Sequence, residues 1–289
     1  MAKPRVAVFG AGGFSGRHFE RFVATESLGE SYEFFGHTRD PNNAEQTGAV
    51  SYRQGDPTRK DEVAAFIVEV QPDYILNLVG KFRGEGMEDF FQVHLGVSHA
   101  ICEAALQADH APQKIVLVGS AAEYGVTADN PVREDAPAEP INWYGLSKLY
   151  QTHLALYYAR NHALPVVVAR TFNILGEGLS ADLSIGSFDK QIQALPDGGT
   201  IKVGNLETSR DFLDIAEVSR RYWTLLMHGQ PGEIYNICSG APRTIRSVLD
   251  DLIEQSGKRL AVEVDTARLK GRDVAAIYGD PSKFDRLGA

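Results

Sequence analysis

The sequence predicts an α/β fold with a doubly wound parallel sheet and a smaller C-terminal lobe. Three observations lead to this prediction. In the first half of the chain, short β-branched segments alternate with longer amphipathic stretches, as in strand–helix units that build a parallel sheet. A glycine-rich turn directly follows the first of these segments. Beyond residue 170 the chain changes to glycine-rich loops with shorter helices and brief strands.

Six segments are expected to form the strands of the sheet. Each is nearly continuous in apolar residues, which is typical of parallel strands that are buried on both faces. They span residues 5–9, 33–37, 50–53, 73–78, 114–118 and 166–170. The helices expected between them span residues 14–26, 59–70, 88–106 and 143–161.

The change in composition divides the chain into two expected parts. We expect residues 1–170 to form the first domain and residues 171–289 to form the smaller lobe. Brief strands are expected in the lobe at residues 201–203 and 261–264. An apolar segment at residues 233–238 indicates a strand that returns to the main sheet, so residues 232–240 are expected to rejoin the first domain.

The composition is that of an ordinary globular protein. With 43% hydrophobic and 23% charged residues, the chain can bury a full core. No apolar run approaches the roughly 20 residues of a membrane span, and the apolar stretch within Met1–Gly10 is too short for a secretory signal, so a cytoplasmic location is expected. The net charge of -9 opposes nonspecific binding to nucleic acid or to an anionic membrane. Only Cys102 and Cys238 are present, without paired spacing, so we expect neither a disulfide framework nor a metal site.

The glycine-rich turn predicts a dinucleotide-binding site of the Rossmann type. Glycines between a first strand and its helix let the backbone turn tightly and approach a pyrophosphate, whose charge the helix N-terminus stabilises. A glycine-rich turn without a ligand is the alternative, but the position at the first strand–helix junction favours binding. The residues expected to contact the cofactor here are Gly10, Gly12, Gly13, Phe14, Ser15 and Gly16.

The end of the second strand determines which dinucleotide is expected. A site for NAD usually places a carboxylate there to accept the ribose hydroxyls, whereas a nearby Arg accommodates the 2′-phosphate of NADP. Thr38 falls roughly where that acid would lie, and Arg39 follows it, so we expect NADP(H). NAD stays as the alternative, because Asp40 would restore an acid after a shift of two residues.

Two further loops are expected to contact the cofactor. Asp56 follows the third strand and could place a carboxylate near the adenine amino group, although a turn or a helix cap explains it nearly as well. After the fourth strand we expect contacts from Leu78, Val79 and Gly80.

Three side chains form the candidate catalytic group. Tyr144 and Lys148 are four residues apart and therefore share one face of a helix. Ser120 lies directly beyond the fifth strand, at the edge where a parallel sheet presents its ligand groups. Reduction of a carbonyl needs a proton donor, a hydrogen bond that polarises the ketone and a hydride source, which Tyr144, Ser120 and a nicotinamide can supply. Lys148 is expected to lower the pKa of the phenol and to hold the nicotinamide ribose.

With this glycine loop and these three side chains, the chain resembles the extended short-chain dehydrogenase/reductases over essentially its whole length. Further segments resemble the sugar-nucleotide branch of the NAD-dependent epimerase/dehydratase family, most of all its GDP-4-dehydro-6-deoxy-D-mannose reductases. These segments are Arg170-Thr171-Phe172-Asn173, Ser209-Arg210-Asp211-Phe212, residues 231–240 and residues 279–283.

The resemblance implies a substrate and a set of contacts. The substrate would be a nucleotide-linked 4-keto-6-deoxy sugar, and reduction of GDP-4-dehydro-6-deoxy-D-mannose would give GDP-D-rhamnose. Asn173 would contact the sugar or its phosphate, Arg210 the pyrophosphate, and Val203 and Asn205 the base region. The lobe would thus bind the substrate, and residues 1–170 would bind NADP. A homodimer is also implied, because the helices at 88–106 and 143–161 form a dimer interface in many relatives.

The sequence departs from the family at two places. Near Leu269 the family commonly has Arg-Pro, whereas this chain has Lys270 and Arg272, which we assign to phosphate binding. His94 stands where Asn is usual, and that Asn supports the active-site hydrogen-bond network in relatives. We interpret His94 as a buried, hydrogen-bonded histidine rather than as a catalytic one.

The residues after Ser120 favour reduction over dehydration. Family dehydratases carry acids in the next two positions, because elimination of water needs an additional acid and base, but here both are alanine, Ala121 and Ala122. Glu123 lies one position further and is not expected to substitute. A 4-epimerase uses the same three catalytic groups and is the main alternative, although it would be expected to keep the acid of the second strand. A noncatalytic NADP-binding protein would not need the three groups together.

Overall fold

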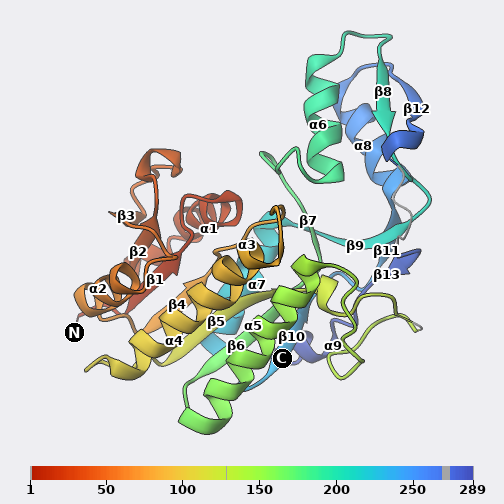
Figure 1. Ribbon diagram of the computed structural model, residues 1–289. Helices are drawn as coiled ribbons and strands as arrows, with labels where there is room; N and C mark the ends of the chain where they lie inside the picture. The colour runs from red at the N-terminus through yellow and green to blue at the C-terminus, as the bar shows by residue number, and fades with distance from the viewer. Residues whose placement is uncertain (1, 128, 269–273, 289) are drawn as a thin grey trace.

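A seven-stranded parallel sheet forms the centre of the molecule (Figure 1). The computed structural model describes residues 2–127, 129–268 and 274–288. The strand order is β10-β6-β5-β4-β1-β2-β3, and all neighbours are parallel. The strands are β1 (Arg5–Phe9), β2 (Glu33–Thr38), β3 (Val50–Gln54), β4 (Tyr74–Asn77), β5 (Lys114–Ser120), β6 (Val166–Thr171) and β10 (Ile234–Ile237). The predicted doubly wound fold is confirmed.

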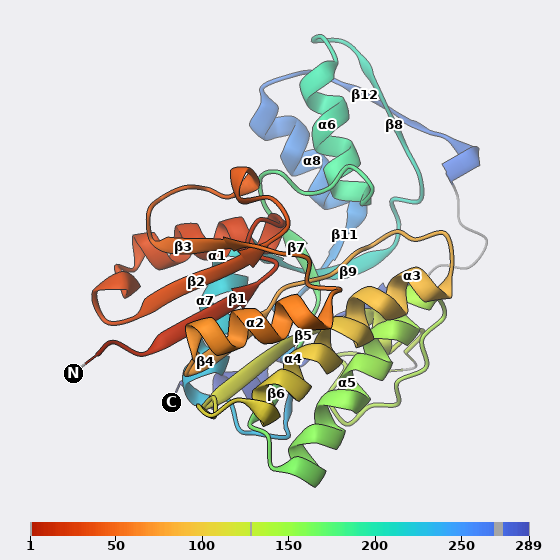
Figure 2. The same cartoon turned by 60° about the vertical axis from the view of Figure 1, so that its left-hand side comes forward.

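Helices cover both faces of this sheet (Figure 2). Because successive side chains of a strand point to opposite faces, Val6 and Val8 of β1 pack in one core cluster, and Ala7 and Phe9 pack in another. The first cluster is covered by α1 (Phe14–Thr25) and α7 (Ile215–His228), and the second by α2 (Lys60–Val70), α4 (Val97–Gln107) and α5 (Trp143–His162).

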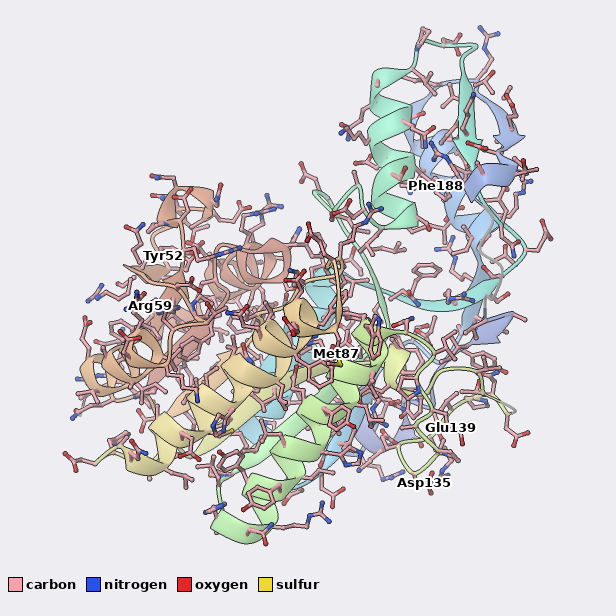
Figure 3. All side chains as sticks on the ribbon, viewed as in Figure 1. Tyr52, Arg59, Met87, Asp135, Glu139 and Phe188 are labelled. Atoms are coloured by element: carbon pink, nitrogen blue, oxygen red, sulfur yellow. The ribbon has the colours of Figure 1, made fainter. Side chains whose placement is uncertain are left out.

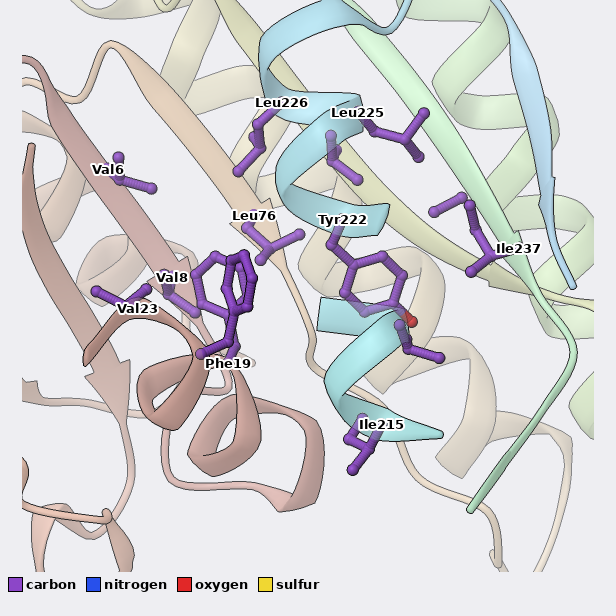
Figure 4. Close-up of a cluster of buried hydrophobic side chains, with 14 of the residues drawn as sticks. Val6, Val8, Phe19, Val23, Leu76, Ile215, Tyr222, Leu225, Leu226 and Ile237 are labelled. Carbon is purple, nitrogen blue, oxygen red and sulfur yellow. The ribbon is translucent and has the colours of Figure 1, made fainter. Parts of the chain in front are cut away.

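Helix α7 packs against the large sheet, although it comes from the range expected to form the lobe. Figure 4 shows Tyr222 and Leu225 of this helix beside Leu76 of β4, with Phe19 of α1 nearby. All four side chains are buried, and burial of each such apolar group stabilises the fold by about 1.5–3 kcal/mol. The carboxylate of Asp214 caps the helix by accepting a hydrogen bond from the Ala216 N–H at 2.7 Å.

The C-terminal lobe, at the upper right of Figure 1, has a hydrophobic core of its own. It contains α6 (Ser184–Ala194), α8 (Ile245–Ser256) and the parallel pair β8 (Thr200–Val203) and β12 (Ala261–Val264). The brief strands expected at 201–203 and 261–264 are therefore present. Phe188 of α6 belongs to this core, and Figure 3 places it far from Tyr52 and Arg59 at the opposite side of the molecule.

A second, four-stranded sheet lies between the C-terminal lobe and the large sheet. Strand β9 (Ser209–Asp214) pairs with β7 (Asn173–Leu175), β11 (Pro242–Thr244) and β13 (Ala276–Ile277). Figure 1 shows β9 crossing from one part to the other. The remaining short elements are η1 (Leu28–Glu30), η2 (Pro41–Asn43), η4 (Ala121–Glu123), η5 (Thr266–Arg268) and α9 (Ser282–Asp285).

The single helix expected at residues 88–106 is present without a gap, and it consists of three consecutive segments. These are α3 (Met87–Phe91), a π-helical segment η3 (Gln92–Gly96) and α4. Figure 3 shows Met87, at the start of α3, close to the N-terminal end of α5. π-Helical turns are rare and often mark functional sites. The predicted helix is therefore confirmed, but the π-helical segment within it was not foreseen, because apolar periodicity does not distinguish such a segment from regular α-helix.

The other boundaries agree with those expected to within two residues. Strand β10 pairs with β6, which confirms the return of the chain to the main sheet. In the part of the chain that the structure describes, no helix combines the length and apolarity needed to cross a membrane.

Candidate active site

The site lies where the strand order of the large sheet reverses direction. From β1 the chain proceeds outward to β2 and β3, and then returns to the other side of β1 through β4. In doubly wound sheets, the carboxyl ends of the strands at such a point form the ligand-binding crevice. Phe9, Asn77 and Ser120 end the three strands that converge there.

The glycine-rich turn is shaped for close approach of a phosphate group. Gly10 has φ +77°, and a Cβ atom there would lie 2.9 Å from the Val79 nitrogen. The N–H groups of Gly10 and Ala11 both donate to the carbonyl of His37, at 3.0 and 3.3 Å. Helix α1 then begins at Phe14, and its N-cap residue Gly13 provides no side-chain hydrogen bond to the first helical N–H groups. This arrangement fits a dinucleotide pyrophosphate at the helix N-terminus.

The end of β2 presents a hydroxyl to this turn rather than a carboxylate. Thr38 is buried, and its Oγ1 lies 2.4 Å from the position that a Cβ of Gly12 would occupy. Arg39 is exposed beside it. The carboxylate of Asp40 accepts hydrogen bonds from Asn42 N, Asn42 Nδ2 and Asn43 Nδ2 at 3.0–3.1 Å. The acid that could have favoured NAD is therefore engaged within its own loop.

Two further predicted cofactor segments lie near the same turn. Asp56 accepts hydrogen bonds from the backbone and hydroxyl of Thr58 at 2.9 and 2.8 Å, which favours its interpretation as a turn residue. These bonds lower the pKa of the Asp56 carboxyl. The N–H of Leu78 donates to the Phe9 carbonyl at 3.0 Å, so the start of residues 78–80 is held against β1. Ser15 and Gly16 both lie in the first turn of α1.

Helix α5 brings the predicted catalytic side chains to the end of β5. The side chain of Asn142 caps this helix by accepting a hydrogen bond from Gly145 N at 2.8 Å. A Cβ at Gly145 would lie 2.4 Å from the Ala122 carbonyl oxygen, so only glycine permits this approach of the helix to the turn after Ser120. Tyr144 and Lys148 follow on α5, as predicted.

The phenol of Tyr144 is kept in its protonated form. Burial raises the pKa of Tyr144 to about 12, a hydrogen bond with Ser120 lowers it, and the charge of Glu123 raises it. The lowering of the phenol pKa that we predicted from Lys148 is therefore not seen, because desolvation outweighs the other effects. The Tyr144 ring packs edge-on against the ring of His94, with centroids 5.5 Å apart.

The ammonium group of Lys148 is buried and held by neutral acceptors. Its Nζ donates to the Val118 carbonyl at 2.8 Å and to Gln151 Oε1 at 3.1 Å. Burial lowers the pKa of Lys148 to about 8, and the negative charge of Glu123 raises it. Gln151 also donates to the Val118 carbonyl at 3.1 Å, so it fixes the position of the amine. We did not single out Gln151 from the sequence, although its i,i+3 spacing from Lys148 was visible.

A buried ion pair lies directly beneath Ser120. The carboxylate of Glu123 accepts hydrogen bonds from Ser120 N at 2.8 Å, Thr152 Oγ1 at 2.8 Å and Arg170 Nε at 2.9 Å. Arg170 Nη2 lies 2.8 Å from the same carboxylate, and both side chains are almost completely buried. Ser120 Oγ in turn accepts from Ala122 N at 3.2 Å, which completes a capping box. The Ser-x-x-Glu spacing was the available signal for this contact.

The predicted substrate residues are distributed over the second sheet and the lobe. Asn173 Nδ2 donates to the Asp211 carbonyl at 3.1 Å, and Arg210 Nη1 donates to the carbonyls of Ser209 and Val274 at 2.8 and 2.7 Å. Val203 is fully buried in the lobe core, so its side chain is not available to a base. Asn205 is exposed. Lys270 and Arg272 lie outside the described residues.

Other expectations concerned cysteines and metals. Cys102 and Cys238 are both free thiols and both buried, which agrees with their interpretation as core or turn residues. Among residues 2–127, 129–268 and 274–288, no group of three or more His, Cys, Asp or Glu side chains is placed to hold a metal ion.

A parallel sheet with this order, a glycine turn at its switch point and Ser120 facing Tyr144 define a nicotinamide-dinucleotide-dependent enzyme of the short-chain dehydrogenase/reductase class. The chain belongs to the NAD dependent epimerase/dehydratase family, whose model matches residues 6–238. It is therefore a nucleotide-sugar-modifying enzyme of that family, and the resemblance found in the sequence is confirmed.

Individual relatives include enzymes that act on GDP-linked deoxy sugars. The chain is 30% identical over 222 residues to the GDP-6-deoxy-D-mannose reductase of Pseudomonas aeruginosa, covering 74% of this chain and 73% of the relative. It is 23% identical over 249 residues to the GDP-6-deoxy-D-talose 4-dehydrogenase of Aggregatibacter actinomycetemcomitans, covering 85% and 83%. The solved structure of RMD from Pseudomonas aeruginosa complexed with NADPH matches with a TM-score of 0.82 and 25% identity, covering 99% of this chain and 92% of that chain.

Proposed function

We propose that this protein uses NADPH to reduce the 4-ketone of a nucleotide-linked 4-keto-6-deoxy sugar, converting GDP-4-dehydro-6-deoxy-D-mannose to GDP-D-rhamnose. The observation that carries the proposal is the end of β2, where Thr38 meets Gly12, Arg39 is exposed and Asp40 is engaged in its own loop. A guanidinium without a competing carboxylate suits the 2′-phosphate of NADPH. The identity to a GDP-6-deoxy-D-mannose reductase supports the choice of substrate.

The proposed chemistry assigns one task to each catalytic side chain. When bound, the nicotinamide supplies hydride to the carbonyl carbon. The Ser120 hydroxyl donates a hydrogen bond to the carbonyl oxygen, and Tyr144 donates its phenolic proton to that oxygen as negative charge develops. Lys148 holds the ribose through its remaining N–H donor. A Tyr144 pKa of about 12 keeps the phenol protonated at neutral pH, so the proton donor that the reduction needs is in place.

The environment of Ser120 also argues against dehydration. Ala121 and Ala122 provide no acid, and the carboxylate of Glu123 is turned away into its buried pair with Arg170. A 4,6-dehydratase needs an additional acid and base at the sugar. We infer that neither is available from this turn.

The remaining assignments extend the same proposal. Asn173 and Arg210 would bind the sugar and pyrophosphate, the backbone near Val203 and Asn205 the base, and Lys270 and Arg272 the phosphates. Residues 171–289, without the elements that rejoin the large sheet, would form the substrate lobe. We infer a cytoplasmic homodimer, supported by the exposed aromatic rings of Trp143, Tyr150 and Tyr157, which recur every seven residues on one face of α5.

A panel of substrates tests the proposal. Purified protein and NADPH are incubated with GDP-, UDP- and dTDP-linked 4-keto-6-deoxy sugars, and products are identified by NMR. We expect oxidation of NADPH with the GDP-linked ketone and a new C4 alcohol. In Tyr144→Phe, turnover should fall by about a hundredfold to ten-thousandfold while NADPH binding survives. Tyr157→Phe, on an exposed ring of the same helix, is the matched control and should retain turnover. The epimerase alternative is tested with the corresponding nucleotide-linked 4-hydroxy sugars and NAD, where inversion at C4 without net change in the reduced cofactor would establish it instead.

A further inference from the structure

His94 lies in the π-helical segment η3 and joins two sides of the active site. Its side chain is completely buried. The backbone N–H of Lys81 donates to His94 Nε2 at 3.2 Å, and His94 Nδ1 lies 2.8 Å from Ser147 Oγ. Ser147 Oγ also lies 2.8 Å from the backbone carbonyl oxygen of Tyr144. A continuous chain of hydrogen bonds therefore runs from the loop after β4 to the first turn of α5.

The direction of each bond in this chain follows from its end groups. A backbone N–H can only donate, so Nε2 of His94 must carry the lone pair that accepts from Lys81. A neutral imidazole then has its proton on Nδ1 and donates it to Ser147 Oγ. The single hydroxyl proton of Ser147 is left to donate to the Tyr144 carbonyl. Burial and the charge of Lys148 lower the pKa of His94 to about 2, so the ring stays in this one neutral form.

The surrounding contacts place this bridge at the nicotinamide end of the predicted cofactor site. A Cβ atom at Gly80 would lie 3.8 Å from His94 Nε2 and 3.9 Å from Lys148 Nζ. Phe82, one residue beyond Lys81, packs its half-exposed ring on Tyr144 with centroids 5.7 Å apart. The loop that His94 holds therefore touches the predicted proton donor, while the adenosine end lies elsewhere, at Thr38.

We propose that His94 is a positioning residue that, as an uncharged bridge with Ser147, fixes the loop at Gly80–Lys81 against the first turn of α5 and so sets the nicotinamide against Tyr144. The inference rests on the proposed use of a nicotinamide cofactor. His94 touches neither reacting atom in this scheme, and its effect is transmitted through the loop backbone, through Ser147 and through its edge-on contact with the Tyr144 ring. The two ring nitrogens of His94 are the atoms that reach both partners.

Binding of a whole cofactor and of its fragment distinguishes positioning from general structural damage. The wild type is first titrated with NADPH and with NADH, and the cofactor that binds more tightly is used for all variants. Its binding is compared with that of the fragment that lacks nicotinamide, which is 2′-phospho-ADP-ribose for NADPH and ADP-ribose for NADH. In His94→Phe and in Ser147→Ala, we expect the Kd of the whole cofactor to rise by about three- to tenfold, as for a lost neutral hydrogen bond. The fragment should bind within about twofold of wild type.

Three further results complete the test. His94→Gln, which can still accept from Lys81 or donate to Ser147, should restore part of the affinity. The double variant His94→Phe/Ser147→Ala should lose no more than the worse single variant, because both changes break one bridge. His99→Gln is the matched control, since His99 on α4 also bonds to α5, through Tyr158 OH at 2.8 Å, but away from Tyr144. It should leave both ligands unaffected.

Two outcomes would overturn the proposal. Equal weakening of cofactor and fragment would show that His94 supports the fold in general, and unchanged binding of both would show that the bridge positions nothing. Because Ser147→Ala is a small change, it keeps the test decisive if His94→Phe does not fold. Failure of the proposed reduction is a separate result, since a wild type that turns over no 4-keto sugar would still give the binding comparison.

Discussion

The substitution Glu123→Gln tests whether the buried pair with Arg170 organises the active site. Gln keeps the shape of the side chain and an oxygen that can accept from Ser120 N, but its amide nitrogen meets donors on Arg170 and Thr152. The guanidinium is left buried without its counter-charge. Breaking a buried ion pair by removal of one partner costs about 3–5 kcal/mol, so we expect the free energy of unfolding to fall by that amount.

The same substitution should change the pH dependence of turnover. The negative charge of Glu123 raises the pKa of both Tyr144 and Lys148, so its removal should lower both. Tyr144 acts as an acid in the proposed reaction, and turnover falls as pH rises through its pKa. The alkaline limb of the kcat profile should therefore move to lower pH in the variant.

Urea unfolding followed by tryptophan fluorescence measures the first effect, and kcat measured between neutral and high pH measures the second. Glu254→Gln, an exposed carboxylate on α8, is the matched control and should change neither. A loss below about 1 kcal/mol would mean that Arg170 finds another partner at little cost. An alkaline limb at the same pH as wild type would refute the electrostatic coupling to Tyr144.

The other predictions concern packing, approach and cofactor choice. Gly145→Ala places a methyl group 2.4 Å from the Ala122 carbonyl oxygen, so α5 must move away from Ser120. We expect kcat to fall by about a hundredfold, and unchanged turnover would contradict the close approach of the helix to this turn. Leu225→Ala in the core under the sheet should lower the free energy of unfolding by about 2–5 kcal/mol in urea titrations, whereas a loss under 1 kcal/mol would mean that the site collapses around the change. Arg39→Ala should weaken the binding of NADPH by about 1.5–3 kcal/mol and leave the binding of NADH nearly unchanged. Equal losses of affinity for both cofactors in titrations would rule out the assignment of Arg39 to the 2′-phosphate.

The fold and the glycine loop could be predicted because their signals are local. Apolar runs of five or six residues define buried parallel strands, and the glycines between β1 and α1 follow from the backbone that a phosphate site requires. The four-residue spacing of Tyr144 and Lys148 likewise needs only helical geometry. Each of these inferences depends on residues that are close together in the sequence.

The parts that could not be predicted depend on partners that are distant in the sequence. From the sequence, Glu123 was noted only as an acid that lies one position beyond those used by family dehydratases. Its ion pair with Arg170 was not predicted, because the two residues are 47 positions apart. The expected effect of Lys148 on Tyr144 failed for a related reason, because the desolvation of both groups is set by the packing of β5 against α5. Val203 was matched to a family motif, yet burial in the lobe core removes its side chain from any ligand.

The proposed catalytic groups alone do not select one reaction in this family, since a reductase and an epimerase can share Ser120, Tyr144 and Lys148. The selection must come from groups that set protonation and cofactor exchange. Here burial, together with the Glu123 charge, keeps the phenol protonated, as a tyrosine that begins the proposed reaction by giving a proton requires. An epimerase regenerates its cofactor internally and benefits from holding it tightly, whereas a reductase must release the oxidised form. An exposed Arg39 beside the end of β2, with Asp40 engaged within its own loop, favours NADPH as the exchangeable cofactor in the proposed reaction. The proposed reduction thus requires a protonated Tyr144 at one part of the site and a 2′-phosphate contact at Arg39 in another, and each can be tested separately.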